Sequence, residues 1–174
     1  MYKRHDYDCD TLILSVGLIP ENELSLGAGV ELDNRTKGAI VDENFQTGVD
    51  GIFAAGNVLH VHDLVDFVSI EAENLADAVA EYVRDGSLPD CGILITTDSN
   101  INYTVPQKVS GEKDFKLSMR VKKPIIKCKI VVKQGGEVVK SVNMKKSIPA
   151  EMIQIFIPKK LLKSREDLEV SVQC

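Results

Sequence analysis

The sequence has no tryptophan, and none of its apolar runs approaches the ~18 residues that a membrane-spanning helix needs. Its first residues, MYKRHDYDCDTL, include basic side chains but no apolar core after them, which does not fit a secretory signal. Four cysteines are scattered without a C-x-x-C spacing, so neither a zinc site nor a dithiol redox motif is expected. We therefore expect a cytoplasmic protein with reduced thiols and no membrane span. Cys9 and Cys128 are expected to be packing residues.

Glycine-rich turns of the form G-x-G-x-x-G, which place a pyrophosphate at a helix N-terminus, are also absent. The stretch GAGVEL, residues 27–32, has two of the glycines but not the third, and it leads into a predicted strand. No Ser-His-Asp or Cys-His arrangement has a recognisable frame, and there is no internal repeat or low-complexity tract. Hydrolytic chemistry is therefore not expected, and we assign no catalytic residue.

The charge divides the 174-residue chain into two parts. Residues 1–90 carry 5 Lys+Arg against 18 Asp+Glu, whereas residues 91–174 carry 16 against 8. In the basic part the lysines alternate with apolar residues, as in KCKIVVK and VVKSVNMKK, which is typical of a solvated strand face. The aromatic side chains that a single-strand nucleic-acid binder uses are missing from these runs. We predict two units, residues 1–88 and 92–174, and no nucleic-acid partner.

The first unit mixes short strands with one helix. Thr11–Val16 is a continuous apolar run that ends before Gly17, which predicts a buried strand. Residues 30–32 and 39–41 predict a small hairpin, and GIFAA, residues 51–55, predicts a further strand.

A helix is predicted in the stretch DFVSIEAENLADAVAEYVRDG, residues 66–86. Gly86 is a suitable C-terminal stop, and Asp66 or Ser69 is a candidate N-cap. Its apolar residues recur at helical spacing and form one stripe: Val68, Ala72, Leu75, Ala76, Val79 and Val83.

The second unit, after a linker at residues 85–92, contains about seven strand-like segments. Lys127 and Lys129 alternate with Cys128 and Ile130, as expected for a strand with one buried face. The turn QGGE, residues 134–137, predicts a hairpin with a two-glycine loop. Seven short strands in about 80 residues predict an all-β immunoglobulin-like sandwich.

Two ordered motifs in the first unit carry a family resemblance. The first is the strand end SVGLIPEN, which is similar to V-G-x-x-P-N with one residue inserted, and the second is the stretch TGVDGIFAAGNV. The matching residues are Val16, Gly17, Pro20 and Asn22 in the first motif, and Thr47, Ile52, Phe53, Ala54, Gly56 and Asn57 in the second.

In this order, with a hairpin between and a helix after, the motifs resemble the C-terminal segment of the pyridine nucleotide-disulfide oxidoreductases, which are FAD- and NAD(P)-dependent flavoproteins. The stretch HVHDLVDFVSIEAE further resembles the bacterial branch that includes the A subunit of anaerobic glycerol-3-phosphate dehydrogenase. The resemblance implies a partial FAD/NAD(P)-binding α/β fold for the first unit, and it does not cover the second.

The resemblance also implies cofactor-binding residues. Gly56, Asn57 and Val58 would line the ribityl side of FAD, and the helix start at Asp66, Phe67 and Val68 would lie at the pyrimidine edge. Asn57 stands where the family has Asp, and an amide can both accept from and donate to a ribityl hydroxyl.

The stretch HVHD places His60 and His62 two residues apart, with Asp63 adjacent. Three potential ligands suggest a metal, but no distant fourth ligand is evident, so we favour a hydrogen-bonded loop and predict no metal site. His5 lies in a polar stretch and is expected to be solvated.

The leading hypothesis is a C-terminal fragment of an FAD-dependent NAD(P)H oxidoreductase, which supplies part of the flavin pocket and an accessory sandwich. FAD and NAD(P)H would be bound in the intact enzyme, with the remaining N-terminal part as partner, whereas this chain alone would bind neither. A non-catalytic binding module with a remnant flavoprotein segment is the alternative. Because such a fragment exposes strand edges and the helix stripe, we also expect a homodimer.

Overall fold

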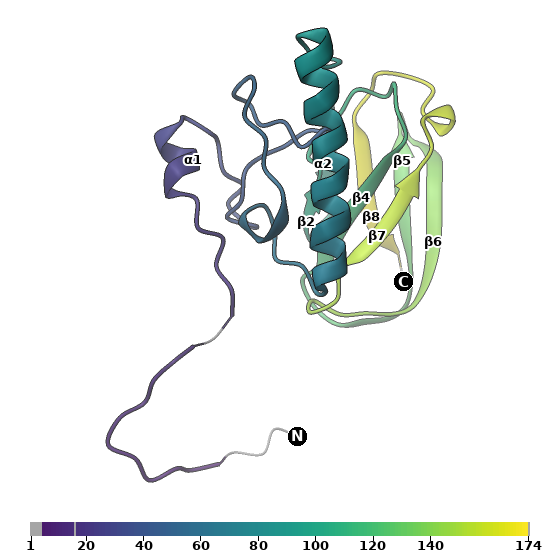
Figure 1. Ribbon diagram of the computed structural model, residues 1–174. Helices are drawn as coiled ribbons and strands as arrows, with labels where there is room; N and C mark the ends of the chain where they lie inside the picture. The colour runs from purple at the N-terminus through teal and green to yellow at the C-terminus, as the bar shows by residue number, and fades with distance from the viewer. Residues whose placement is uncertain (1–4, 16, 174) are drawn as a thin grey trace.

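The computed structural model describes residues 5–15 and 17–173. Two helices, two short 3₁₀ helices and eight strands follow one another along the chain (Figure 1). In order they are α1 (Glu23–Gly27), η1 (Gly56–Val58), α2 (Val65–Asp85), β1 (Ile93–Thr97), β2 (Ile101–Val105), β3 (Lys108–Val109), β4 (Phe115–Val121), β5 (Ile125–Gln134), β6 (Glu137–Ser147), β7 (Ile153–Ile157), η2 (Lys159–Leu161) and β8 (Leu168–Gln173).

The strands form two open sheets, one of five strands in the order β3-β1-β8-β5-β6 and one of three in the order β2-β4-β7. β1 pairs with β8 in parallel, and the other pairs are antiparallel. Alternate side chains of both sheets enter one shared core, in which Leu117 and Ile130 are fully buried. The seven longer strands, β1, β2 and β4 to β8, account for the approximately seven strand-like segments that the sequence indicated, whereas the two-residue β3 was not predicted. The immunoglobulin-like type stays a prediction.

The β5–β6 hairpin is confirmed, because Gln134 pairs with Glu137 across a two-residue turn. Gly135 and Gly136 both have positive φ, 56° and 81°, a conformation that glycine adopts without strain. Lys127 and Lys129 are exposed while Cys128 is buried, so the solvated face expected for β5 is also confirmed.

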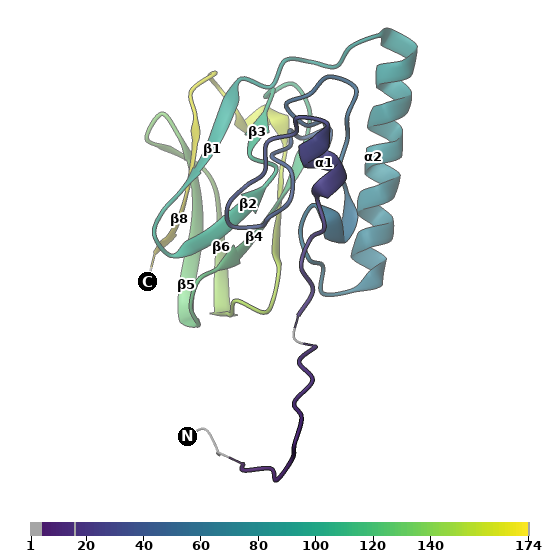
Figure 2. The same ribbon diagram turned by 90° about the vertical axis from the view of Figure 1, so that its left-hand side faces the viewer.

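A second, smaller core crosses the boundary between the two predicted units. Buried side chains before α2, among them Val41 and Leu59, pack in one cluster with Tyr103 and Val105 of β2. The backbone N–H of Gln107 donates to the Val41 carbonyl at 3.0 Å, and the Gln107 side-chain oxygen accepts the Val41 N–H at 2.9 Å. In both ribbon views α2 accordingly runs alongside the strands (Figures 1 and 2).

The prediction of a buried strand at Thr11–Val16 is wrong for residues 11–15, and Val16 lies outside the described residues. Leu12, Ile13 and Leu14 are 74%, 88% and 73% exposed. In the ribbon views this segment extends away from the rest of the molecule, so no described strand lies beside it to pair its backbone groups (Figures 1 and 2). Cys9 is exposed for the same reason, which contradicts its predicted packing role, whereas that of Cys128 is confirmed.

The short strands predicted before α2 form only isolated bridges. Leu32 bridges Ala39 in antiparallel fashion, which confirms the hairpin pairing, and Phe53 of the GIFAA segment bridges Gln46. Neither bridge extends into a strand: the Leu32–Ala39 bridge consists of two backbone bonds, from Asp33 N–H to the Gly38 carbonyl at 2.8 Å and from Ile40 N–H to the Glu31 carbonyl at 3.0 Å. The five-residue helix α1 was not predicted.

Helix α2 is confirmed, with Gly86 in the left-handed conformation at its C-terminal end, φ 77°. The predicted N-caps are wrong, because the helix begins after Leu64 and has no side-chain cap there. Its apolar stripe is largely exposed or half-buried, and only Glu71 and Ala78 are buried. Over the described ranges, no helix combines the length and the apolar character needed to cross a bilayer.

Gly38 is the point of closest backbone approach in the first unit. It is buried, and a Cβ added to it would lie 1.8 Å from the carbonyl oxygen of Leu59, just after η1. The hairpin loop therefore lies directly against the backbone of the segment that leads to α2.

We predict that Gly38→Ala lowers the free energy of unfolding by roughly 3 kcal/mol, the upper end of overpacking costs, because backbone must move to admit the methyl group. Gly48→Ala is the matched control: Gly48 has open space around it, so its change should stay within ~0.5 kcal/mol. Urea unfolding followed by circular dichroism measures both. Equal stability of the two variants would contradict the close packing at Gly38.

Candidate functional site

The loop between the GIFAA segment and α2 contains the residues that the sequence singled out. Gly56 opens η1 with φ 74° and is buried, and its N–H donates to Glu71 Oε1 of α2 at 2.6 Å. A Cβ at this position would meet only Val68 Cγ1, at an ordinary 3.5 Å. Positive φ, rather than crowding within this chain, is therefore what requires glycine here; its approach to a flavin stays a prediction.

The two sequence motifs meet at Val58. Asn22, the buried last residue of the first motif, donates from Nδ2 to the carbonyls of Val58 and Lys37, both at 2.9 Å. Asn57 is exposed, and its Oδ1 accepts the backbone N–H of His62 at 3.1 Å. The side chain of Asn22 thus fixes the chain around η1, and Asn57 shapes the turn that follows.

The start of α2 lies against this loop only in part. Val68 is half-buried beside Gly56, and Phe67 is half-buried and lines a cavity of about 370 Å³ between α2, the 42–45 loop and β4. Asp66 is exposed. The structure therefore brings Val68 to Gly56 and leaves Asp66 at the surface.

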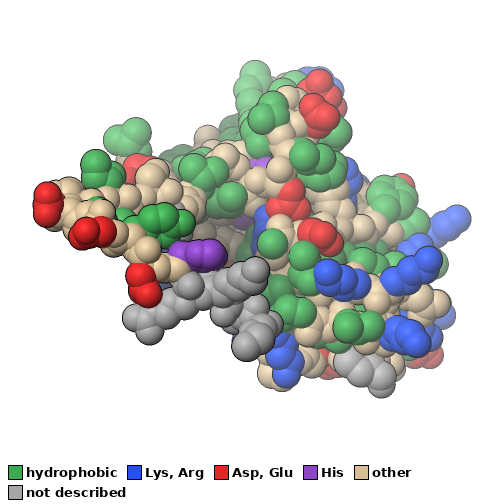
Figure 3. Space-filling view, turned by 90° about the horizontal axis from the view of Figure 1, so that it is seen from below, with side chains coloured by type: hydrophobic (Ala, Val, Ile, Leu, Met, Phe, Trp, Pro, Cys, Tyr) green, Lys and Arg blue, Asp and Glu red, His purple; other side chains and the backbone are tan. Residues whose placement is uncertain are grey.

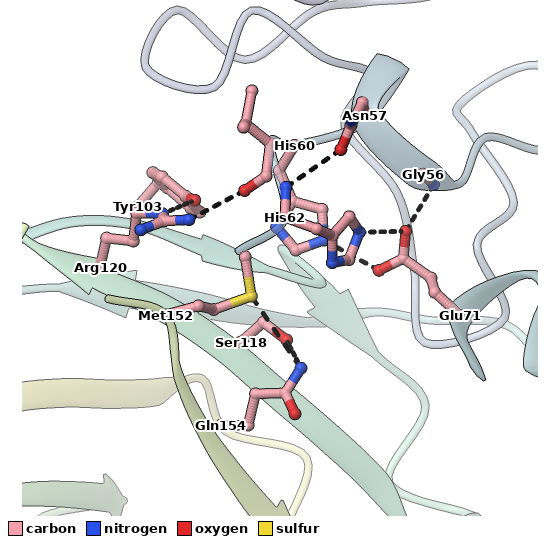
Figure 4. Close-up of polar contacts among 11 residues, drawn as sticks. Gly56, Asn57, His60, His62, Glu71, Tyr103, Ser118, Arg120, Met152 and Gln154 are labelled. Atoms are coloured by element: carbon pink, nitrogen blue, oxygen red, sulfur yellow. Dashed lines mark hydrogen bonds and ion pairs between the residues drawn. The ribbon is translucent and has the colours of Figure 1, made fainter. Parts of the chain in front are cut away.

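A cluster of His60, His62 and Glu71 forms behind Gly56, and Figure 4 shows all three side chains converging. His60 Nε2 lies 2.8 Å from Glu71 Oε2, and His62 Nε2 lies 3.1 Å from Glu71 Oε1. The three side chains are 1%, 2% and 9% exposed, and the two imidazole rings lie edge to face with centroids 4.4 Å apart. We call this group the His60–His62–Glu71 cluster.

Glu71 carries a buried negative charge. Burial is the largest influence and by itself raises the pKa of this carboxyl, but hydrogen bonds from His60, His62 and the Gly56 N–H together lower the pKa to about 2. At neutral pH the carboxylate is therefore ionised and can only accept hydrogen bonds. Both Nε2 atoms must then carry the proton that they share with it.

Sequence reasoning missed Glu71 and offered Asp63 in its place. Asp63 instead forms an ion pair with Arg120 of β4 and accepts the Met152 N–H at 2.7 Å. One signal could have identified Glu71: it lies three residues after Val68 and four before Leu75, so it is a carboxylate within the apolar stripe of α2. His5, expected to be solvated, is exposed.

Arg120 joins the loop to the strand-rich unit. Its guanidinium donates to the Tyr103 hydroxyl at 2.9 Å (Figure 4). It also donates to the Val61 carbonyl at 2.9 Å and to the Pro149 carbonyl at 3.1 Å, besides its ion pair with Asp63. A second cavity, of about 280 Å³, lies beside it and is lined by residues 18–20 and by His60. Glu71 lines the first cavity and His60 lines the second.

Comparison with known proteins finds similarity to one family over the first part of the chain. Residues 2–80 match the family model described as pyridine nucleotide-disulphide oxidoreductase. Over 80 residues the chain is 29% identical to a ferredoxin–NADP reductase of Leuconostoc mesenteroides subsp. mesenteroides, which covers 46% of this chain and 24% of that protein. Over 60 residues it is 45% identical to the mitochondrial dihydrolipoyl dehydrogenase of Caenorhabditis elegans, which covers 33% of this chain and 12% of that protein.

The first part of the chain is therefore similar to the pyridine nucleotide-disulfide oxidoreductases. The family match ends at residue 80, before β1. The chain spans about a quarter or less of the length of these curated relatives. No solved structure matches the chain.

We predict that the charge of Glu71 makes stability depend on pH. The pKa of Glu71 is about 2 in the folded chain against an ordinary 4.5, so its stabilisation is complete above about pH 4.5 and is lost as the pH falls toward 2. A difference of this size corresponds to on the order of 3 kcal/mol.

Glu71→Gln should therefore unfold more easily than the wild type at neutral pH and should lose less stability on acidification. Urea unfolding at several pH values measures both effects. Glu73→Gln, an exposed position on the same helix, is the control and should follow the wild type. Parallel pH profiles for the wild type and Glu71→Gln would contradict the ionised, buried carboxylate.

Proposed function

We propose that this chain is the C-terminal segment of an FAD-dependent NAD(P)H oxidoreductase and that it supplies one wall of the flavin pocket. The observation that carries the proposal is the contact of the two family motifs, in which Asn22 of the first holds the Val58 carbonyl next to Gly56 and Asn57 of the second. The family match over residues 2–80 supports the same function.

The residues present fit the ribityl side of a flavin. Gly56 has the positive φ that the turn needs, and the neighbouring Asn57 exposes an amide that can exchange hydrogen bonds with hydroxyl groups. Among the described side chains none caps the start of α2 after Leu64, so the positive end of the helix dipole is available to an electron-rich ring edge. The chain has no glycine-rich turn for the pyrophosphate, which the preceding part of the enzyme would provide.

A bound flavin would supply hydride-transfer chemistry between NAD(P)H and an acceptor. In this proposal the chain would bind and orient the flavin rather than react: Gly56, Asn57 and Val58 would hold the ribityl chain, and Asp66, Phe67 and Val68 would lie at the pyrimidine edge. Glu71 fixes Gly56 by accepting its N–H, so α2 and the cofactor loop keep one geometry.

Three finer assignments belong to the proposal. The HVHDLVDFVSIEAE stretch favours the branch that includes the A subunit of anaerobic glycerol-3-phosphate dehydrogenase. The strand-rich unit would be an accessory sandwich of immunoglobulin-like type. Cys9, Cys91 and Cys128 are free thiols, which agrees with a cytoplasmic location.

We predict that this chain alone takes up no stoichiometric FAD, whereas a natural polypeptide that continues upstream through a glycine-rich turn does. Flavin titration followed by absorbance measures both. Tight uptake by the short chain would contradict the fragment assignment, and a flavin-free longer polypeptide would contradict the function. If translation starts at Met1, a non-catalytic binding module becomes the better explanation.

In the flavin-containing polypeptide, Gly56→Ala should raise the FAD dissociation constant about tenfold or more, because an alanine at φ 74° costs about 1–2 kcal/mol of strain in the cofactor loop. Gly48→Ala, eight residues earlier and in open space, is the matched control and should bind FAD like the wild type.

We further propose that the short chain is a homodimer. Leu12, Ile13 and Leu14 are exposed in succession on an extended segment, and such an unpaired apolar edge favours association with a second copy. In Figure 3 acidic side chains stand on this extended arm, and Lys and Arg gather over the strand-rich unit, so opposite charges could meet between copies.

Light scattering at tens of micromolar, a concentration chosen from ordinary interface affinities, should give twice the chain mass of 19.1 kDa. Serine at residues 12, 13 and 14 together should return the mass to that of the monomer. Leu94→Ser, at an exposed position of β1, is the control. A monomeric wild type would contradict the dimer.

A further inference from the structure

We propose that the His60–His62–Glu71 cluster binds a divalent transition-metal ion of the zinc type. Two imidazoles and one carboxylate from separate elements converge here, His60 and His62 from the loop and Glu71 from α2. This inference concerns the chain itself and does not depend on the flavin assignment.

The spacing of the donor atoms suits a tetrahedral ion. Zinc bonds of ~2.0–2.2 Å to nitrogen and oxygen imply ligand atoms roughly 3.3 Å apart at the corners of the tetrahedron. The Nε2–Oε distances are 2.8 Å and 3.1 Å, and all three donor atoms lie within 4.8 Å of one another. The two Nε2–Oε separations therefore lie within about 0.5 Å of the value that a tetrahedral ion requires.

The charge of the cluster also favours a cation. Glu71 is buried, and its hydrogen-bond partners are two imidazoles and the Gly56 N–H. A divalent ion would compensate this buried carboxylate more fully than shared protons do. If the ion binds Glu71 through Oε2, the hydrogen bond from the Gly56 N–H to Glu71 Oε1 is kept.

Metal binding displaces the proton on Nε2 of each histidine, and Nδ1 of the same ring can accept it. Without metal, each histidine donates its Nε2 proton to Glu71, so Nδ1 carries none when the ring is neutral. The buried Nδ1 atoms of His60 and His62 have no hydrogen-bond partner within the described part of the chain. The proton can therefore move from Nε2 to Nδ1 without breaking a bond there, and Nε2 is freed to bind the ion.

The ligand set defines the class of ion and leaves one position open. Imidazole nitrogens select zinc, cobalt, nickel or copper over magnesium and calcium, which prefer oxygen ligands. Three protein ligands leave the fourth tetrahedral position for water or a small ligand. Glu71 lines the 370 Å³ cavity, which provides the space for this fourth group.

The test is titration of the purified chain with Co²⁺ and Zn²⁺, followed by visible absorption for Co²⁺ and by calorimetry for both. A Cys9→Ser background removes the exposed thiol as a competing ligand. The expected result is one ion per chain, with Co²⁺ bands of four-coordinate intensity that Zn²⁺ abolishes.

His62, Glu71 and His5 give a matched set of variants. His62→Ala and Glu71→Gln should each weaken binding ~100-fold or more, since loss of a mere outer-shell partner already costs 10–100-fold. His5→Ala, at the exposed terminus, should bind like the wild type. Circular dichroism verifies that each variant is folded, and if one is not, the wild-type Co²⁺ spectrum decides alone.

Absence of binding by the wild-type chain, or a six-coordinate Co²⁺ spectrum, would overturn the proposal. So would binding that survives in His62→Ala and Glu71→Gln, or that is lost in His5→Ala, because the ion would then lie elsewhere.

Discussion

The carboxylate of Glu71 connects helix α2 to the loop that precedes it. It accepts hydrogen bonds from the Gly56 N–H and from His60 and His62, so one side chain of α2 fixes the start and the end of the preceding loop. A buried carboxylate is costly unless such donors surround it, and these three donors compensate for its burial. Moving Glu71 away from these donors would leave its buried charge unpaired. The geometry of the loop therefore depends on this side chain.

Arg120 extends this connection to the strands. Its guanidinium contacts Val61 and Asp63 on the loop and Tyr103 on β2, while Val105 of β2 packs in the small core beneath the loop. Since the family match ends before β1, the strand-rich unit adjoins the candidate site through residues outside the matched region. The strand-rich unit therefore forms part of the surroundings of the loop.

Sequence patterns predicted the elements whose stability is local or repeated. The 3.6-residue spacing and Gly86 located α2, and alternation located seven strands, because these signals reflect burial on one face. Sequence patterns predicted wrongly where an element depends on a neighbouring segment. The apolar run at residues 11–15 predicts a strand, yet no described neighbour pairs with it. Glu71 was missed because its partners come from the loop, and contacts of this kind depend on tertiary folding.

The exposed apolar side chains can also be explained by a missing neighbouring surface. Val83 and Leu12 are 77% and 74% exposed, one on the stripe of α2 and the other on the extended arm. Natural monomers seldom leave such residues in series without a covering surface. The strand-rich unit has its own filled core but also exposes apolar side chains, such as Ile126 at 71%, so exposed apolar surface is not confined to the region that resembles the oxidoreductases.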